Sequence, residues 1–149
     1  VKKFKKLDFK KYHPSGNLAN KLKTASDLML TKSKIPFVNE NESIKNALVV
    51  LNKKKLGFII IVDNNRFNKG IFTDGDLKRS LQKNIDIEKV KIKKVMTKAP
   101  FSVEENSLIT DIIVKMNKRK ITSVCVYKGK NKKKIIGVIH IHHILKFLK

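Results

Sequence analysis

The chain contains the same kind of unit twice. The segment 70–77, Gly-Ile-Phe-Thr-Asp-Gly-Asp-Leu, aligns with the segment 137–144, Gly-Val-Ile-His-Ile-His-His-Ile. Upstream of each lie a methionine, a proline followed by phenylalanine, an amphipathic segment and a β-rich run. A repeated unit usually buries its apolar face against its copy, so the repeat constrains the architecture more than any single motif. It also predicts two candidate ligand sites of unequal chemistry, because the two segments carry different polar residues.

Each unit is predicted to fold in the order β-α-β-β-α, which makes the chain an α/β protein. In the first unit the pattern predicts a strand at 35–38, a helix from Asn41 or Ser43 to Lys54, strands at 58–62 and 70–72, and a helix at 74–83. The first helix is indicated by apolar residues at helical spacing, and the apolar run 58–62 is typical of a strand buried on both faces. The apolar positions of that helix are Ile44, Ala47, Leu48 and Leu51.

The second unit is predicted to repeat this order. We expect a strand at Pro100-Phe101, strands at 122–126 and 135–139, and a last helix at 142–148. The helix between the first two of these strands has the expected apolar positions Leu108, Ile112, Val114 and Met116.

The predicted domain boundaries follow from the repeat. Residues 1–24 form a leading tail, residues 25–84 the first unit and residues 85–149 the second, with a linker at 82–93. No apolar stretch approaches the roughly 20 residues of a membrane span, and the N-terminus lacks the apolar block of a signal peptide. The chain begins with Val1 rather than Met, which suggests a fragment.

The formal net charge of +23 invites a nucleic-acid-binding interpretation. Nearly all of the positive charge is lysine, whereas nucleic-acid readers usually depend on arginine for bidentate and stacking contacts. Lys, Asn and Ile, all abundant here, share AT-rich codons, so a genome bias explains the three together. We therefore expect no specific nucleic-acid partner and no membrane partner, but an attraction of anionic ligands to any cleft.

The lone cysteine, Cys125, lies in a strand-like run. It is expected to be a buried, inert thiol, because one cysteine forms no internal disulfide and no ligand pattern surrounds it. A reducing compartment, the cytoplasm, fits this usage.

The first repeat segment carries the strongest candidate site. A strand ends, the hydroxyl of Thr73 follows, a helix begins, and the carboxylate of Asp76 comes three residues after the hydroxyl. The free N–H groups of a helix N-terminus favour phosphate, and a carboxylate accepts the paired hydroxyls of a ribose. Equally, Thr73 and Asp76 have the spacing of an ordinary capping box. The residues alone leave both interpretations open.

The second segment replaces these residues with His140 and His143, which removes the ribose acceptor. Either this site is unused or it holds another anion through imidazole. We expect no metal site, because His142 and His143 point about 100° apart on a helix and no fourth ligand is near. His13, in the tail, belongs to no catalytic constellation within the chain.

The two units, each ending in Gly followed by two apolar residues, resemble tandem CBS motifs, the pair that forms a pseudo-twofold Bateman module. The resemblance covers residues 25–149, and the signature Gly-h-h-Thr-x-x-Asp (h, apolar) is intact as Gly70, Thr73 and Asp76. CBS pairs bind adenosine nucleotides or related ligands between their units and regulate an attached domain. The resemblance therefore implies a regulatory module without a cofactor.

A narrower set of segments closely resembles the C-terminal half of the D-arabinose 5-phosphate isomerases of the KpsF/GutQ family. That resemblance maps His13 to the active site of a preceding sugar isomerase domain. This domain interconverts ribulose 5-phosphate and arabinose 5-phosphate at the entry to Kdo and lipopolysaccharide biosynthesis. The rest of that domain is absent, so the fragment is not expected to isomerise anything. The matching segments are 8–22, 26–29, 56–57, 70–77 and 121–124.

One departure affects the second site. The family's second unit usually reads Gly-Val-h-His-x-His-Asp-Leu, and here His143 takes the place of the Asp. This puts the second ligand contact in doubt.

The resemblance implies a regulatory ligand between the units, either CMP-Kdo, the activated end product, or an adenine nucleotide. Phe37 and the strand at Phe58 would pack the base, Asp76 would hold the ribose and Thr73 the phosphate. The alternatives are a module that binds nothing and holds a dimer or tetramer of the parent enzyme together through its helices, or a basic nucleic-acid-binding protein. The full set of expected ligand-binding residues is Pro36, Phe37, Gly57, Phe58, Thr73, Asp76, His140 and His143.

Overall fold

The computed structural model describes residues 21–98 and 100–148. These residues form two compact units that do not follow the order of the chain. The central unit is Lys32–Pro100, and the terminal unit combines the described parts of Val1–Thr31 and Phe101–Lys149. The short segment that leads into each repeat therefore packs on the other repeat, so that residues 25–31 belong to the terminal unit and residues 32–84 to the central unit.

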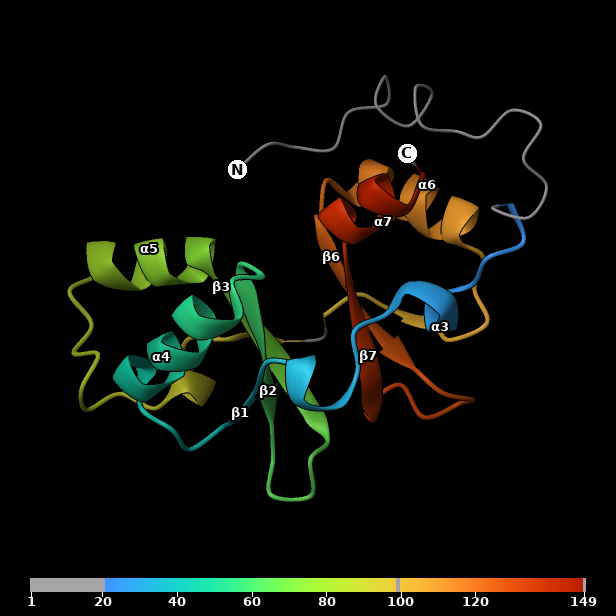
Figure 1. Ribbon diagram of the computed structural model, residues 1–149. Helices are drawn as coiled ribbons and strands as arrows, with labels where there is room; N and C mark the ends of the chain where they lie inside the picture. Colours follow the sequence, from blue (N-terminus) through green and yellow to red (C-terminus); the bar gives the residue numbers. More distant parts are fainter. Residues whose placement is uncertain (1–20, 99, 149) are drawn as a thin grey trace. The chain divides into compact units, whose positions relative to one another are not determined.

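The central unit is a four-stranded sheet in the order β1-β2-β3-β4, and Figure 1 shows α4 and α5 on one side of it. Strand β1 is parallel to β2, while β3 is antiparallel to both β2 and β4. A parallel pair needs a crossover connection, which α4 supplies. The elements are η1 (Lys32–Lys34), β1 (Phe37–Asn39), α4 (Ile44–Lys54), β2 (Phe58–Val62), β3 (Asn68–Thr73), α5 (Asp74–Gln82), η2 (Ile92–Lys94) and β4 (Thr97–Lys98).

The terminal unit repeats this plan with a three-stranded sheet in the order β5-β6-β7. Its pairings match those of the central unit, parallel for β5 with β6 and antiparallel for β6 with β7. Leu30 bridges Val138 on the outer edge of β7, where the central unit has β4. The elements are α3 (Ala25–Leu28), β5 (Ser102–Glu104), α6 (Ile109–Arg119), β6 (Ser123–Tyr127), β7 (Ile135–His140) and α7 (Ile141–Leu148).

In each unit, a methionine of the leading segment packs against a glycine of the sheet, Met29 against Gly137 and Met96 against Gly70. An added Cβ at Gly137 would overlap Met29 Sδ, and one at Gly70 would lie 3.0 Å from Met96 Sδ and 2.5 Å from the Thr97 carbonyl oxygen. Real Cβ atoms essentially never show contacts below 3.0 Å. Both glycines are therefore required by a close approach of the segment that precedes the other repeat.

Each unit has its own aliphatic core, as the hydrophobic pattern predicts. In α4 the inward residues Ile44, Ala47 and Leu51 are buried, and all of β2 is buried. Ser43 caps α4, since its hydroxyl accepts a hydrogen bond from Asn46 N at 3.1 Å. The predicted strand at 58–62 and the helix ending at Lys54 are thereby confirmed.

Three predicted details are wrong. Val114 is 53% exposed, because the inward series of α6 is Ile109, Ile112, Ile113 and Met116, and Val114 falls off that helical face. The first strand of each unit begins two residues later than predicted, after its proline, at Phe37 and at Ser102. The segment 82–93 is more than a linker, because Ile92 in η2 is fully buried in the core of the central unit.

Cys125 is buried in β6, and burial raises the pKa of its thiol to about 12. The prediction of a buried, inert thiol is confirmed, because the reactive thiolate is absent near neutral pH. Among residues 21–98 and 100–148, no helix is both long and apolar enough to cross a membrane.

Candidate functional site

The junction between β3 and α5 forms a complete capping box. Thr73 Oγ1 accepts a hydrogen bond from Asp76 N at 3.2 Å, and Asp76 Oδ2 accepts one from Thr73 N at 2.9 Å. The Thr73 hydroxyl also lies 3.2 Å from the same carboxylate oxygen. Two of the N–H groups that a helix start leaves without partners are satisfied in this way.

The second oxygen of Asp76 has partners from further away. Asp76 Oδ1 accepts from Arg79 Nη2 and, at 3.1 Å, from Thr97 Oγ1. Asp76 is 5% exposed, whereas the Arg79 side chain is 63% exposed. Arg79 is therefore the partner that a ligand hydroxyl can replace at least cost, because its guanidinium is easily rehydrated.

Gly57 and Phe58 lie beside this junction. Phe58 faces Thr73 in the register of β2 and β3, and Asp74 N donates to the Gly57 carbonyl at 3.3 Å. Gly57 has a φ of +77°, in the region that residues with a side chain rarely adopt. Phe58 is buried, so its ring is part of the sheet packing in this structure.

Two other expected ligand-binding residues, Pro36 and Phe37, lie further from the junction. Pro36 is buried and its carbonyl accepts from Ile60 N at 2.9 Å. The Phe37 ring is partly exposed and lies under the Arg66 guanidinium, 5.1 Å from the ring centroid to Cζ. Of the predicted residues, the central unit thus brings Gly57, Phe58, Thr73 and Asp76 together at one end of its sheet.

The matching junction of the terminal unit is built from imidazoles. The His140 ring stacks on His142 with 4.7 Å between centroids and meets His143 edge-on at 6.1 Å. His140 Nδ1 accepts from His142 N at 3.2 Å. Burial, followed by the neighbouring His142 and His143, lowers the pKa of His140 to about 4. His140 is therefore neutral at pH 7 and offers a hydrogen-bonding group rather than a positive charge.

Two further features of this junction follow from the structure. Ser123 pairs with His140 in the register of β6 and β7, and its hydroxyl oxygen is buried without a hydrogen-bond partner in the described part of the chain. No group of three or more His, Cys, Asp or Glu side chains in that part is arranged to hold a metal ion. The predicted active-site residue His13 lies outside the described residues.

Sequence reasoning missed three participants: Arg79, Thr97 and Ser123. Arg79 follows Asp76 by three residues on α5, a spacing at which helical side chains meet, so a local signal existed. Thr97 comes from the segment leading into the second repeat. It reaches Asp76 only because each leading segment packs on the other repeat, which we call the exchange of leading segments. The only signal for Ser123 was its position in the second repeat, where it corresponds to Phe58 of the first.

The amino-acid sequence matches a known family model, that of the CBS domain, at residues 25–83 and 92–149. The chain belongs to the CBS domain family. The matched residues make up most of the chain, and the fold class predicted from the repeat is confirmed.

Among relatives, the CBS pair is similar to arabinose 5-phosphate isomerase KdsD. It is 39% identical to the protein from Yersinia pestis over 144 residues, 96% of this chain and 43% of that protein. It is 37% identical to the protein from Escherichia coli strain K12 over 140 residues, 93% of this chain and 42% of that protein. The chain therefore spans less than half the length of these relatives.

Solved structures share the fold. The CBS domain pair of protein MJ0100, in complex with 5′-methylthioadenosine and S-adenosyl-L-methionine, superposes with a TM-score of 0.72 at 25% identity, over 85% of this chain and 95% of that one. CBSX2 in complex with AMP gives a TM-score of 0.70 at 22% identity, over 83% and 94% of the two chains. The second of these shows the fold alone.

Proposed function

We propose that this chain is the regulatory, nucleotide-binding CBS pair of an arabinose 5-phosphate isomerase. Support comes from the 39% identity to the Yersinia pestis isomerase over nearly the whole chain. In the parent enzyme, a sugar isomerase domain would convert ribulose 5-phosphate to arabinose 5-phosphate for Kdo and lipopolysaccharide synthesis, with His13 at its active site. The parent would work in the cytoplasm, where thiols such as Cys125 stay reduced.

The observation that carries the proposal is the junction at Thr73 and Asp76. A buried carboxylate accepts four hydrogen bonds there, and one donor, Arg79, lies mostly in solvent. A ribose offers two adjacent hydroxyl donors, which would take the place of Arg79 at the carboxylate. The start of α5 and the Thr73 hydroxyl attract the phosphate that follows the ribose.

The ligand class has independent support. The CBS pair of MJ0100, at 25% identity, holds two adenosine-based ligands, 5′-methylthioadenosine and S-adenosyl-L-methionine. For a Kdo-pathway enzyme, the economical ligand is CMP-Kdo, the activated end product, which would give feedback inhibition. It would act by binding one state of the parent enzyme more tightly than the other, since only differential affinity shifts an equilibrium.

A thermal-shift panel tests ligand binding. This chain is melted alone and with AMP, ATP, CMP and CMP-Kdo at equal concentration, since only a ligand that prefers the folded state raises the melting temperature. Selective stabilisation by CMP-Kdo supports the feedback sensor, and selective stabilisation by AMP or ATP supports an adenine-nucleotide sensor. No shift with any of the four would contradict nucleotide binding.

A pair of variants assigns the binding to the junction. Asp76→Asn removes the charge that accepts the ribose hydroxyls, and we expect calorimetry to show about tenfold weaker nucleotide binding. Asp111→Asn makes the same charge change on the exposed first turn of α6 and serves as the control. Equal affinities of the two variants would place the nucleotide elsewhere.

A second candidate function is oligomerisation without a ligand, favoured by apolar side chains on the helix surfaces. Val49 on α4 is 63% exposed, Leu81 on α5 54% and Val114 on α6 53%. Val49 and Val114 occupy the same position of the two repeats, so both units offer an apolar residue there. Sedimentation of the unsubstituted chain and of its Val49→Lys and Val114→Lys variants tests this. A stable oligomer that dissociates on substitution supports the proposal, and a monomeric unsubstituted chain rejects it.

A further inference from the structure

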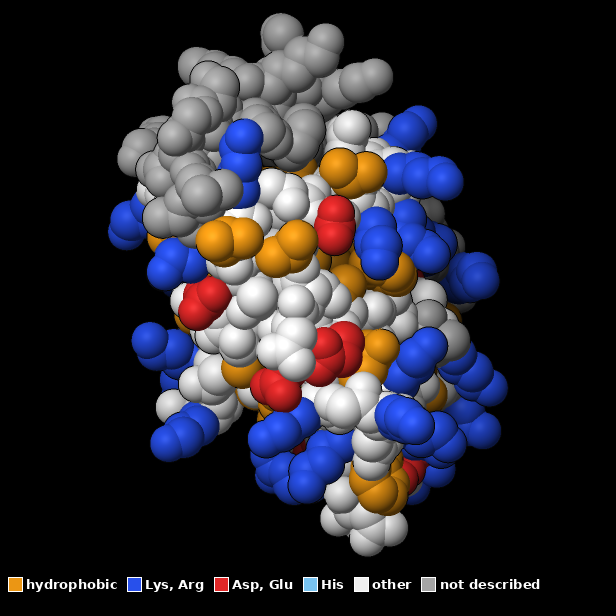
Figure 2. Space-filling model, turned by 90° about the vertical axis from the view of Figure 1, so that its right-hand side faces the viewer, with side chains coloured by type: hydrophobic (Ala, Val, Ile, Leu, Met, Phe, Trp, Pro, Cys, Tyr) orange, Lys and Arg blue, Asp and Glu red, His pale blue; other side chains and the backbone are white. Residues whose placement is uncertain are grey.

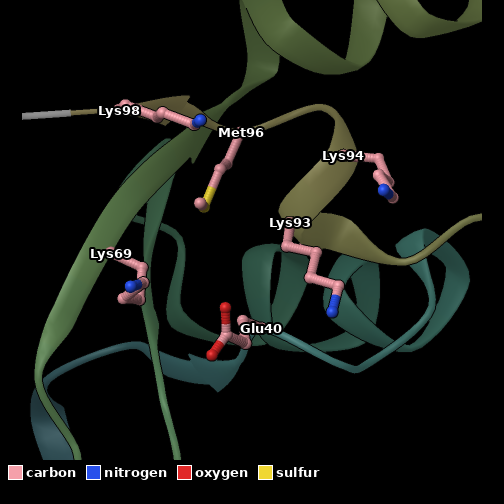
Figure 3. Close-up of a pocket in the computed structure, with 6 residues that line it drawn as sticks. All are labelled: Glu40, Lys69, Lys93, Lys94, Met96 and Lys98. Atoms are coloured by element: carbon pink, nitrogen blue, oxygen red, sulfur yellow. The ribbon is translucent and has the colours of Figure 1, made fainter.

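The central unit contains an open hollow of about 490 Å³ that the nucleotide proposal does not use. Figure 3 shows Glu40, Lys93 and the Met96 sulfur around a common space, with Lys69 on the strand at one side and Lys94 toward its outer edge. We call it the basic hollow. Its volume lies in the range of small-molecule sites, about 300–1,000 Å³. The lining residues are Glu40, Lys69, Lys93, Lys94, Met96 and Lys98.

The basic hollow lies at the other end of the sheet from Thr73. Glu40 N donates to the Val62 carbonyl at 2.8 Å, and Val62 pairs with Asn68 at the start of β3, whereas Thr73 ends that strand. Thr73 lies four positions along β3 from Lys69, or about 13 Å at 3.3 Å per residue. A ligand in the basic hollow is therefore distinct from one at Asp76.

The walls of the basic hollow are fixed by backbone hydrogen bonds. Lys93 N donates to the Glu40 carbonyl at 3.2 Å, and Ile92 N donates to the Glu42 carbonyl at 2.7 Å, which ties η2 to the end of β1. On the opposite wall, Lys98 pairs with Gly70 in the register of β3 and β4. The side chains thus project from a preformed backbone, which lowers the cost of ordering the site when a ligand binds.

The charges in the basic hollow are unbalanced. Four lysines and one glutamate line it, and the ion pairs found among residues 21–98 and 100–148, Lys45–Glu88 and Arg79–Asp76, include none of its lysines. Like charges brought together in a concave surface repel one another and raise the local concentration of anions. Glu40 offsets one of these four charges, and an anionic ligand would offset more of the repulsion.

The remaining two side chains narrow the ligand class. The Glu40 carboxylate accepts hydrogen bonds from hydroxyl groups and repels a ligand that is anionic throughout. Met96 offers an apolar, adaptable surface for a carbon chain. We propose that the basic hollow binds a sugar phosphate, with its phosphate on the lysines and a hydroxyl on Glu40. This site stands whether or not a nucleotide binds at Asp76.

Methionine-methyl NMR tests the site, because the chain has three methionines, Met29, Met96 and Met116, and only Met96 lines the basic hollow. We would titrate the ¹³C-methyl-labelled chain with D-arabinose 5-phosphate, D-arabinose and inorganic phosphate at 0.15 M salt. The sugar phosphate should shift the Met96 resonance saturably and leave Met29 and Met116 unmoved. An unmoved Met96, or an equal affinity for inorganic phosphate, overturns the proposal.

Two substitutions check the assigned contacts. Lys93→Gln should weaken D-arabinose 5-phosphate about tenfold, while Lys78→Gln, an equal charge change on the exposed side of α5, should weaken it less than twofold. Glu40→Gln should strengthen inorganic phosphate binding and reduce the preference for the sugar phosphate. Equal effects of Lys93→Gln and Lys78→Gln would mean that only net charge matters and would reject the site.

Discussion

The strand-to-helix junctions of the two units share a backbone and differ in chemistry. Both follow a strand that pairs antiparallel with a buried neighbour, and both begin a helix directly. At Thr73 and Asp76 the helix start is closed by a charged capping box, and at His140 and His143 by packed imidazoles. The fold therefore tolerates either solution, and the charged one is confined to the unit that has the intact signature.

The frame around the junctions is the common part. Helices α4 and α6 have eleven residues each and end on left-handed lysines, Lys55 and Lys120. The register of each antiparallel pair shifts at the same place, beside Val62 and beside Tyr127. What the units share is thus fixed by packing and turn geometry, whereas the polar residues at the junction are free to specialise.

Surface charge is common to both units. On the face in Figure 2, lysine and arginine side chains are spread widely and outnumber the acidic side chains. The basic hollow differs from this general background because its four lysines line one concavity. This distinction is the reason that a small anionic ligand is proposed there.

The largest expected effect comes from the two glycines under the methionines. Gly137→Ala and Gly70→Ala should each lower the free energy of unfolding by about 2–4 kcal/mol, because the new methyl group overlaps existing atoms. Urea unfolding followed by circular dichroism measures this change. An unchanged unfolding midpoint in either variant would contradict the close approach.

The same pair separates two kinds of overlap. At Gly137 the atoms in the way all belong to the Met29 side chain, whereas at Gly70 the nearest is the Thr97 carbonyl oxygen. Met29→Ala should therefore relieve Gly137→Ala, with a coupling energy of about 1–3 kcal/mol, and Met96→Ala should relieve Gly70→Ala much less. Equal coupling in both pairs would mean that β4 moves as freely as a side chain.

Much of this architecture was predictable from the sequence, and the reason is local. Periodicity identified α4 and the buried β2, and the repeat identified the family, because these signals depend on neighbouring residues. The exchange of leading segments was not predictable, since nothing near Met29 or Thr97 indicates which repeat they contact. The prediction for Val114 is wrong because residues two positions apart on a helix face different sides, and its neighbours Ile112 and Met116 face the core.

The candidate site shows the same division. Thr73 and Asp76 stood out by spacing, but the spacing alone left a capping box and a ribose contact equally open. The structure shows that the capping hydrogen bonds are formed, and the ribose contact stays a prediction. The basic hollow was not predictable, because its lysines come from three separate segments and look like ordinary solvated charge along the chain.

The next effect concerns the two junctions directly. Asp76→Ala should destabilise the chain by about 1–3 kcal/mol, since it opens the capping box and leaves the Thr97 hydroxyl without its acceptor. It should also weaken nucleotide binding more than His143→Ala does. Chemical denaturation of both variants compares their stability, and calorimetry compares their affinity for the nucleotide. A larger loss of nucleotide binding in His143→Ala would move the main ligand contact to the terminal unit.

A smaller effect is the dependence of stability on pH, which should differ between the two units. Lowering the pH from 7 to 5 protonates His140 in the unfolded chain, where its pKa is near 6.5, before it protonates the folded chain, where it is about 4. The unfolded state then binds more protons, so stability falls. Because His140 is partly solvated, we expect about 1 kcal/mol rather than the full value of the shift.

Hydrogen exchange resolves this loss by unit. The terminal unit should lose protection between pH 7 and 5 once intrinsic exchange rates are corrected, while the central unit, whose residues 32–100 include no histidine, should not. His140→Gln should flatten the response. A loss of equal size in both units would assign the pH dependence to another group.

The smallest expected effect tests the shared frame at its turns. Lys55 and Lys120 have φ values of 58° and 57°, a left-handed conformation that costs a residue with a Cβ about 1–2 kcal/mol and glycine almost nothing. Glycine also gains freedom in the unfolded chain, so Lys55→Gly and Lys120→Gly should each stabilise by a net amount of about 0.5–1 kcal/mol. Thermal melting of both variants measures it. Because the two helix ends have the same geometry, the two gains should be equal. A gain at only one site would show that the lysine at the other makes a contact worth keeping, and the equivalence of the two helix ends would be lost at that point.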